Sequence, residues 1–171
     1  SGILDLFKKR ERVGALTEKD TLQGKKVLIT GSSSGLGLAT AQKLAKHGCN
    51  ICIVHRNRKS ELPEIEKEFD LIKKEGVDLL TFNVDGLKEE ERNKVVLALK
   101  KHFGNTGKIR IFVHSVAKGN LKPMVSEEKN ILKNDDFRLT IEAMAISLYD
   151  WTTALFEAKL FASDARIVSF T

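Results

Sequence analysis

The chain contains few of the residues that mark membrane-spanning, disulfide-rich or nucleic-acid-binding proteins. Only 6% of its 171 residues are aromatic, and only two are cysteines. No segment approaches the roughly 20 consecutive apolar residues of a membrane-spanning helix, and no signal-peptide pattern opens the chain, so we expect a cytoplasmic protein. The net charge is +6, but basic and acidic residues are interleaved. This pattern indicates solvated helix faces and argues against nucleic acid as a main partner.

The two cysteines form a Cys-x-x-Cys pair with His47 and His55 on either side. A redox pair of this kind normally lies at a helix N-terminus, whereas Cys49 and Cys52 lie in CNICIV, an apolar segment typical of a strand. Residues three apart on a strand point to opposite faces, and a zinc site needs four converging ligands. We therefore predict two buried thiols and no metal site.

From residue 22 onward, short apolar runs alternate with helical patterns. The runs are rich in Val, Ile and Phe, which is typical of strands buried on both faces of a parallel sheet. They cover residues 25–30, 50–55, 77–82, 109–114 and 165–170. Apolar residues at helical spacing cover 35–47, 60–75, 87–103 and 135–161, the last with Asp135 or Asp136 as N-cap. Alternation with right-handed crossovers predicts an α/β, Rossmann-type doubly wound parallel sheet of order 3-2-1-4-5.

The sequence divides into a leader and one domain. Residues 1–21 carry apolar residues among charges and are predicted to form a short amphipathic helix. Residues 22–171 form the Rossmann-type domain. Because the chain stops inside or just after the fifth strand, the sheet would end on an exposed apolar edge. We therefore expect a domain that is incomplete on its C-terminal side.

The segment TGSSSGLGLA, residues 30–39, joins the first strand to the first helix. One glycine permits the tight turn, the second lets the backbone approach a pyrophosphate, and the third lets the helix lie against the strand. The helix N-terminus offers unpaired N–H groups and partial positive charge to the anion. No Gly-Lys-Ser/Thr closes the loop, which excludes a Walker A site. The segment predicts a pyrophosphate cradle of Gly31, Ser32, Ser33, Ser34, Gly35, Leu36 and Gly37.

With its leading threonine, this segment resembles the TGxxxGxG fingerprint of the short-chain dehydrogenases/reductases, and the resemblance covers essentially residues 22–171. An acidic residue at the end of the second strand would bind the adenosine ribose and repel a 2′-phosphate. This chain instead has His55-Arg56-Asn57-Arg58. We therefore expect NADP(H), with Arg56 and Ser33 as the 2′-phosphate ligands. The alternative is that the arginines are simply solvated.

The resemblance implies cofactor contacts at the ends of two further strands. After the third strand the family usually has Asp-Val beside the adenine, and this chain has Asn83-Val84 followed by Asp85. After the fourth strand many members have Asn-Asn-Ala-Gly, and this chain has His114-Ser115-Val116-Ala117. Besides the cradle, the cofactor-binding residues implied are therefore His55, Arg56, Asn83, Val84, Ser115, Val116 and Ala117.

Three features near the end of the chain resemble the enoyl-acyl-carrier-protein reductase branch of the family. The first is the segment HSVA, and the second is the twenty-residue distance from Ala117 to Phe137. The third is Met144, which stands where most members have a catalytic asparagine, with Ser147 one turn further on. The resemblance implies an NADPH-dependent reductase of enoyl thioesters in fatty-acid synthesis. A 3-oxoacyl thioester or other carbonyl reductase, and a non-catalytic dinucleotide-binding protein, stay open as alternatives.

The catalytic tyrosine and lysine of the family are not assigned within this chain. The only tyrosine, Tyr149, is followed four residues later by Thr153, so no Tyr-x-x-x-Lys is present. The family pattern places the active-site serine immediately after Thr171. We therefore expect no catalytic residue in this chain and no activity from the 171 residues alone.

The resemblance also implies partners. An acyl thioester carried by acyl carrier protein or CoA is the expected substrate. A homodimer or homotetramer is expected through the helix at 135–161, where the family builds its subunit contacts. Either an apolar interface or packing on the sheet would account for Leu148, Trp151, Leu155 and Phe156.

Overall fold

The structure is a computed structural model, and residues 21–127 and 130–170 are described. The predicted leader helix falls almost wholly within residues 1–20 and lies outside the described residues.

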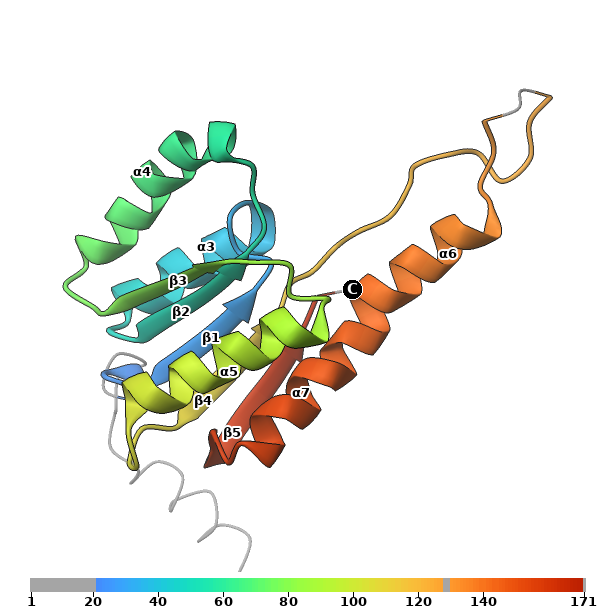
Figure 1. Ribbon diagram of the computed structural model, residues 1–171. Helices are drawn as coiled ribbons and strands as arrows, with labels where there is room; N and C mark the ends of the chain where they lie inside the picture. Colours follow the sequence, from blue (N-terminus) through green and yellow to red (C-terminus); the bar gives the residue numbers. More distant parts are fainter. Residues whose placement is uncertain (1–20, 128–129, 171) are drawn as a thin grey trace, which may run out of the picture.

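A five-stranded parallel sheet forms the centre of the molecule (Figure 1). Its strands are β1 (Lys26–Thr30), β2 (Asn50–His55), β3 (Leu79–Asn83), β4 (Ile109–His114) and β5 (Phe161–Ser169). They lie in the order β3-β2-β1-β4-β5, and all four pairings are parallel. The predicted fold class and strand order are therefore confirmed.

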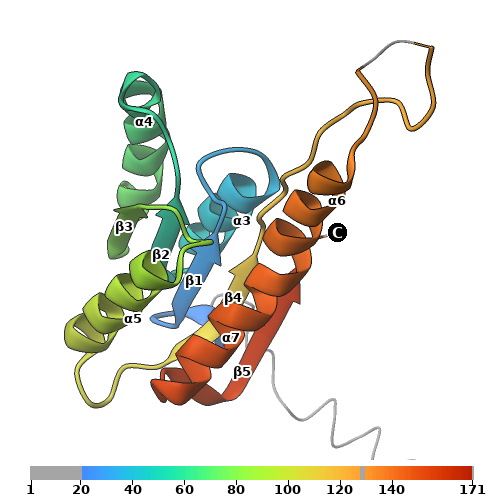
Figure 2. The ribbon, with the colours of Figure 1, turned by 45° about the vertical axis from the view of Figure 1, so that its right-hand side comes forward.

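Helices cover both faces of the sheet, as a doubly wound fold requires (Figures 1 and 2). On one face lie α3 (Gly35–Lys46) and α4 (Leu62–Lys73), the latter preceded by the 3₁₀ turn η1 (Lys59–Glu61). On the other lie α5 (Glu89–Phe103) and α7 (Ser147–Glu157). The remaining helix, α6 (Asn134–Ile141), continues into α7 through the π-helical segment η2 (Glu142–Ile146).

The alternating side chains of the strands build two apolar cores. Leu28 and Cys52 pack in the core beneath α5 and α7, whereas Ile29 and Cys49 pack in the core beneath α3 and α4. The two cysteines are buried free thiols, as predicted, and they belong to opposite cores. Burial raises the pKa of the Cys52 thiol to about 12, so this side chain stays protonated and behaves as a small apolar residue.

The helix predicted at 135–161 is too long at its C-terminal end. The helix ends at Glu157, and Lys159 turns the chain with a φ of 57°. The Ile109 N–H then donates to the Leu160 carbonyl at 2.7 Å, and Phe161 begins β5, four residues before the predicted start. Pairing with β4 therefore decides this boundary, because the local sequence FASDA carries no strong strand pattern.

The N-cap predicted for the same helix is also wrong. Lys133 occupies the N-cap position, and Asp136 lies three residues further on, inside the first turn. The Asp136 carboxylate accepts a hydrogen bond from the Lys133 N–H at 2.8 Å. This contact holds the pKa of Asp136 below its usual range, helped by Asn120 and Lys122 from the preceding connection. The carboxylate therefore stabilises the helix start from N3 rather than from N-cap.

The described part of the chain ends on the apolar strand β5, which pairs with β4 at one edge of the sheet. On this strand Ile167 and Val168 are about half exposed. Among the helices that the structure describes, none combines the length and apolar character needed to cross a bilayer.

Candidate functional site

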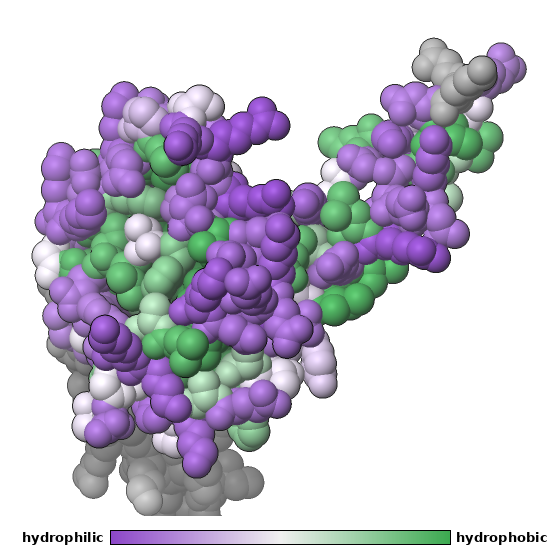
Figure 3. Space-filling model, viewed as in Figure 1, coloured by the Kyte–Doolittle hydropathy of each residue, from purple (hydrophilic) through white to green (hydrophobic). Residues whose placement is uncertain are grey.

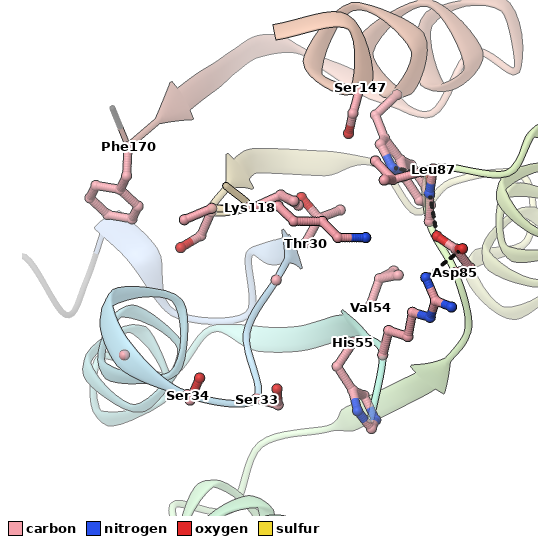
Figure 4. A pocket seen from close by; sticks show the side chains of 18 of the residues that line it. Thr30, Ser33, Ser34, Val54, His55, Asp85, Leu87, Lys118, Ser147 and Phe170 are labelled. Carbon is pink, nitrogen blue, oxygen red and sulfur yellow. Dashed lines mark hydrogen bonds and ion pairs between the residues drawn. The ribbon is translucent and has the colours of Figure 1, made fainter. Parts of the chain in front are cut away.

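A cavity of about 490 Å³ opens at the carboxyl ends of the strands (Figure 4). It lies where the strand order reverses between β1 and β4, which is the position where open α/β sheets bind ligands. The structure brings most of the sequence-predicted residues to this one cavity. Those that line it are Gly31, Ser33, Ser34, Gly35, Leu36, His55, Arg56, Val84, Ser115, Val116 and Ala117.

Three predicted residues do not line the cavity. The Ser32 side chain is fully buried, and its Oγ donates to the Ile29 carbonyl at 3.2 Å, so its hydroxyl is used inside the turn. Gly37 lies behind the loop, and Asn83 is hydrogen-bonded to Asn57 in the neighbouring loop. In this structure these three residues shape the loops around the site instead of facing it.

The glycines of the cradle have separate steric roles. Gly31 has a φ of +75°, and a Cβ there would lie 2.5 Å from the Ser115 carbonyl oxygen, so only glycine fits between β1 and β4. A Cβ on Gly37 would lie 2.6 Å from the Gly31 oxygen, which explains how closely α3 approaches the loop. A Cβ on Gly35 would meet no atom within 4 Å. Gly35 therefore presents bare backbone to the cavity at the N-terminus of α3.

The loops after β2 and β3 are joined by hydrogen bonds and an ion pair. The Asn57 N–H donates to Asn83 Oδ1 at 2.9 Å, and Asn83 Nδ2 donates back to the Asn57 carbonyl at 3.1 Å. The Asn57 side-chain oxygen also lies 2.8 Å from Nδ1 of the buried His55. A further link joins Arg56 to Asp85, with 2.7 Å between Nη1 and Oδ2. These contacts fix one wall of the cavity.

The opposite side of the cavity holds a buried histidine–serine pair. The Nε2 of the fully buried His114 lies 2.9 Å from Ser147 Oγ, and Ser147 itself lines the cavity. Burial lowers the pKa of His114, so its ring is neutral at neutral pH. Among the described residues the Nδ1 of this ring has no hydrogen-bond partner. Met144 lies in the π-helical turn directly before Ser147.

Several lining residues were not identified from the sequence. Two of them, Thr30 and Val54, are at or next to the ends of β1 and β2, where their position in the strand could have indicated them. Trp151 required the tertiary structure: it reaches from α7, and its Nε1 donates to the Gly86 carbonyl at 3.1 Å. The lining residues that were not predicted to bind the cofactor are Thr30, Val54, Asp85, Gly86, Leu87, Lys118, Ser147, Trp151 and Phe170, although Thr30, Asp85 and Ser147 were noted beside the sequence motifs.

Comparisons of the sequence and of the structure with known proteins both find dehydrogenases and reductases. The family model described as short chain dehydrogenase matches residues 25–171. A peroxisomal 2,4-dienoyl-CoA reductase of Arabidopsis thaliana is 27% identical over 131 residues, which cover 77% of this chain and 40% of that protein. A short chain dehydrogenase of Burkholderia cenocepacia, solved in complex with NADP, superposes with a TM-score of 0.70 at 24% identity, covering 86% of this chain and 55% of that one.

A solved structure that contains NAD instead of NADP is about as similar to this chain. An NADH-dependent reductase complexed with NAD has a TM-score of 0.65 at 22% identity, with 90% of this chain and 61% of that chain covered. The chain thus spans about two fifths of the first curated relatives and about 55% of the first solved structures that it matches.

Proposed function

The chain belongs to the short-chain dehydrogenase family, and we propose that it carries the cofactor site of an NADP(H)-dependent reductase. The observation that carries the proposal is the convergence at one cavity of a glycine cradle on a helix N-terminus and of Arg56 at the end of β2. The cradle suits a pyrophosphate, and the guanidinium suits the 2′-phosphate of the phosphorylated cofactor.

Individual residues fit the parts of NADP(H). The backbone at Gly35 and Leu36 offers N–H groups to the pyrophosphate, and the hydroxyls of Ser33 and Ser34 stand beside it. Arg56 has a side chain that is 63% exposed, so its unused donors can reach a 2′-phosphate. The segment Ser115 to Ala117 lines the cavity beyond β4. When bound, NADPH would supply a hydride to the substrate.

The reaction that we propose is reduction of the double bond of an enoyl thioester. Met144 leaves the helix without the catalytic asparagine of most family members, and the polar group that this helix presents to the cavity is the hydroxyl of Ser147, hydrogen-bonded to neutral His114. The similarity to a dienoyl-CoA reductase is consistent with a thioester substrate. The acyl chain would then be carried by CoA or by acyl carrier protein.

Steady-state assays of the complete protein test this reaction. We expect NADPH oxidation with crotonyl thioesters to exceed that with acetoacetyl thioesters. Faster reduction of the acetoacetyl substrate would favour a carbonyl reductase that has diverged and lost the asparagine. Dinucleotide binding without turnover of either would favour a non-catalytic binding protein. Replacing Arg56 by Gln should weaken NADPH binding by about tenfold and leave NADH binding nearly unchanged.

The 171 residues by themselves are proposed to lack activity. Their only tyrosine, Tyr149, is 68% exposed on α7, does not line the cavity, and has no lysine four residues later. Purified polypeptide of these 171 residues should therefore show no hydride transfer to either thioester. Measurable turnover would contradict the assignment of the catalytic groups to sequence outside this chain.

We also propose assembly through the α6–α7 helix, in a cytoplasmic protein. Trp151 and Leu155 are buried in the core, but Phe156 is 72% exposed on the same helix. Other apolar side chains exposed along η2 and the two helices are Phe137, Ile141, Ile146 and Tyr149. A homodimer or homotetramer would cover this surface, and light scattering of the wild type and of Phe156→Glu would test it.

A further inference from the structure

Arg56 is already engaged by an internal carboxylate in the structure. Its Nη1 donates to Asp85 Oδ2 at 2.7 Å, and Figure 4 shows this contact as a dashed line at the labelled Asp85. Arg56 directly follows the last residue of β2, and Asp85 lies two positions after the last residue of β3. Both residues line the cavity. The sequence shows no acidic residue at the end of β2, but the fold brings the carboxylate of Asp85, from the loop after β3, into contact with Arg56.

Asp85 is the fixed member of this pair. Its side chain is only 17% exposed, and its Oδ1 accepts a hydrogen bond from the Leu87 N–H at 3.2 Å. The Asn57–Asn83 hydrogen bonds join the two loops from which Arg56 and Asp85 project. The Arg56 side chain, at 63% exposed, is the member that is free to move. A ligand that approaches Arg56 therefore meets a carboxylate that cannot easily withdraw.

We propose that Asp85 determines cofactor specificity by competing with the 2′-phosphate for Arg56. Carboxylates and phosphates accept hydrogen bonds from the same N–H groups of a guanidinium, so the phosphate must either displace Asp85 from Nη1 or bind next to its negative charge. Both outcomes weaken NADP(H) binding and leave NAD(H), which has a neutral 2′-hydroxyl, almost unaffected. The inference rests on the proposed role of Arg56 as phosphate ligand.

Dissociation constants for NADPH and NADH, measured by calorimetry on the complete protein, test the proposal. Asp85→Asn removes the charge but keeps an oxygen for the Leu87 N–H. We expect it to tighten NADPH binding by about three- to tenfold, in the range of a partly exposed ion pair plus the relieved repulsion, and to change NADH binding by less than about twofold. When Arg56 is also replaced by Gln, Asp85→Asn should strengthen NADPH binding less, because the guanidinium for which Asp85 and the phosphate compete is absent.

A matched control separates this effect from a change in net charge. Asp164 also pairs with an arginine, Arg110, at 2.9 Å, and neither residue lines the cavity. Asp164→Asn makes the same charge change and should leave both dissociation constants unchanged. Unchanged NADH binding by Asp85→Asn also shows that this variant is folded.

The outcomes distinguish this inference from the proposed function. If Arg56→Gln weakens NADPH binding but Asp85→Asn does not strengthen it, Asp85 is not a competitor, and the proposed function stands. Weaker NADPH binding by Asp85→Asn would mean that Asp85 positions Arg56 for the phosphate, which also overturns the inference. If Arg56→Gln leaves NADPH binding unchanged, both the phosphate role of Arg56 and the competition are overturned.

Discussion

The two sides of the cavity are built in different ways. The side formed by β1, β2 and β3 consists of short loops whose polar groups bond to one another, as between Asn57 and Asn83. On the side formed by β4, α6 and α7, residues 118–127 and 130–141 project from the body as an arm (Figures 1 and 2). Figure 3 shows apolar side chains gathered on this arm, where Leu121, Met124, Val125, Phe137 and Ile141 are exposed.

One side is therefore joined by its own hydrogen bonds, whereas the other leaves apolar side chains exposed among the described residues. On the side proposed for the dinucleotide, here called the dinucleotide half, the cradle packs against β4 and the loops after β2 and β3 are hydrogen-bonded to each other. The apolar residues of the arm are exposed in the described part of the chain, where the proposed substrate chain or second subunit would cover them. The dinucleotide half should therefore respond to mutation locally, whereas the other half should respond through the contacts that join it to the sheet.

Truncating Trp151 should produce the largest effect, because this side chain joins the two halves. It is fully buried on α7, lines the cavity, and donates to the Gly86 carbonyl in the loop after β3. Trp151→Ala should lower the free energy of unfolding by about 3–5 kcal/mol. Trp151→Phe, which removes the hydrogen bond and part of the ring, should cost less. Urea denaturation measures both.

A control for Trp151 lies on the same helix. Phe156 is 72% exposed, so Phe156→Ala should change the unfolding free energy of the monomer by less than about 0.5 kcal/mol. A cost for Trp151→Ala as small as that of Phe156→Ala would show that the halves are not coupled through this residue.

Replacing single glycines of the cradle by alanine should distinguish a glycine needed for folding from one needed for binding. Gly31→Ala should destabilise the protein by about 2–4 kcal/mol, since its Cβ would meet the Ser115 carbonyl at 2.5 Å in a strained backbone conformation. Gly35→Ala has a positive φ but open space around its Cβ, so it should cost only about 1 kcal/mol while weakening dinucleotide binding. Thermal denaturation and calorimetric titration measure the two effects.

Gly24 supplies the control for backbone strain alone. Its φ is +73°, close to that of Gly31, but a Cβ there would meet no atom within 4 Å. Gly24→Ala should therefore cost about as much as Gly35→Ala and leave binding intact. Equal destabilisation by Gly24→Ala and Gly31→Ala would contradict the steric role assigned to the contact with Ser115.

The sequence predicted the dinucleotide half more completely than the other half for a physical reason. The positions of Gly31, Gly35 and Arg56 follow from strand–loop–helix patterns within about 30 residues, so local rules locate them. Ser147 and Trp151 reach the cavity from a helix that follows a long connection, and their placement depends on packing. The start of β5 and the end of α7 depend likewise on pairing with β4. The contact between Arg56 and Asp85 depends on the relative position of two strand ends and could not be read from the sequence.

Removing the Ser147 hydroxyl should have an intermediate effect. It lies 2.9 Å from the buried Nε2 of His114, and the Nδ1 of that ring has no partner among the described residues. Ser147→Ala should therefore leave the ring without a partner for either nitrogen and cost about 1–2 kcal/mol of unfolding free energy. Urea denaturation measures the cost. Thr152, whose hydroxyl donates to the Leu148 carbonyl on its own helix, is the control, and Thr152→Ala should be nearly neutral.

The smallest expected effect is a pH dependence that His114 contributes to stability. Burial lowers its pKa in the folded protein below the ordinary value of 6.5. As the pH falls below about 6.5, the unfolded chain therefore takes up a proton that the folded protein does not, and the unfolding free energy decreases. The contribution is fully present above pH 6.5 and should amount to about 1 kcal/mol lost between pH 7.5 and 5.5, because each proton changes the free energy by at most about 1.4 kcal/mol per pH unit.

Other groups also titrate in this range, so the measurement is a difference between variants. His114→Asn, which introduces a non-titrating residue, should show a shallower decline of unfolding free energy between pH 7.5 and 5.5 than the wild type. His102→Asn, at an exposed position on α5, makes the same substitution away from the cavity and serves as the matched control. Parallel curves for wild type and His114→Asn would mean that the ring accepts a proton in the folded state. The half of the cavity beside Ser147 would then carry a positive charge in acid, and a neutral imidazole could no longer be assigned to position that hydroxyl.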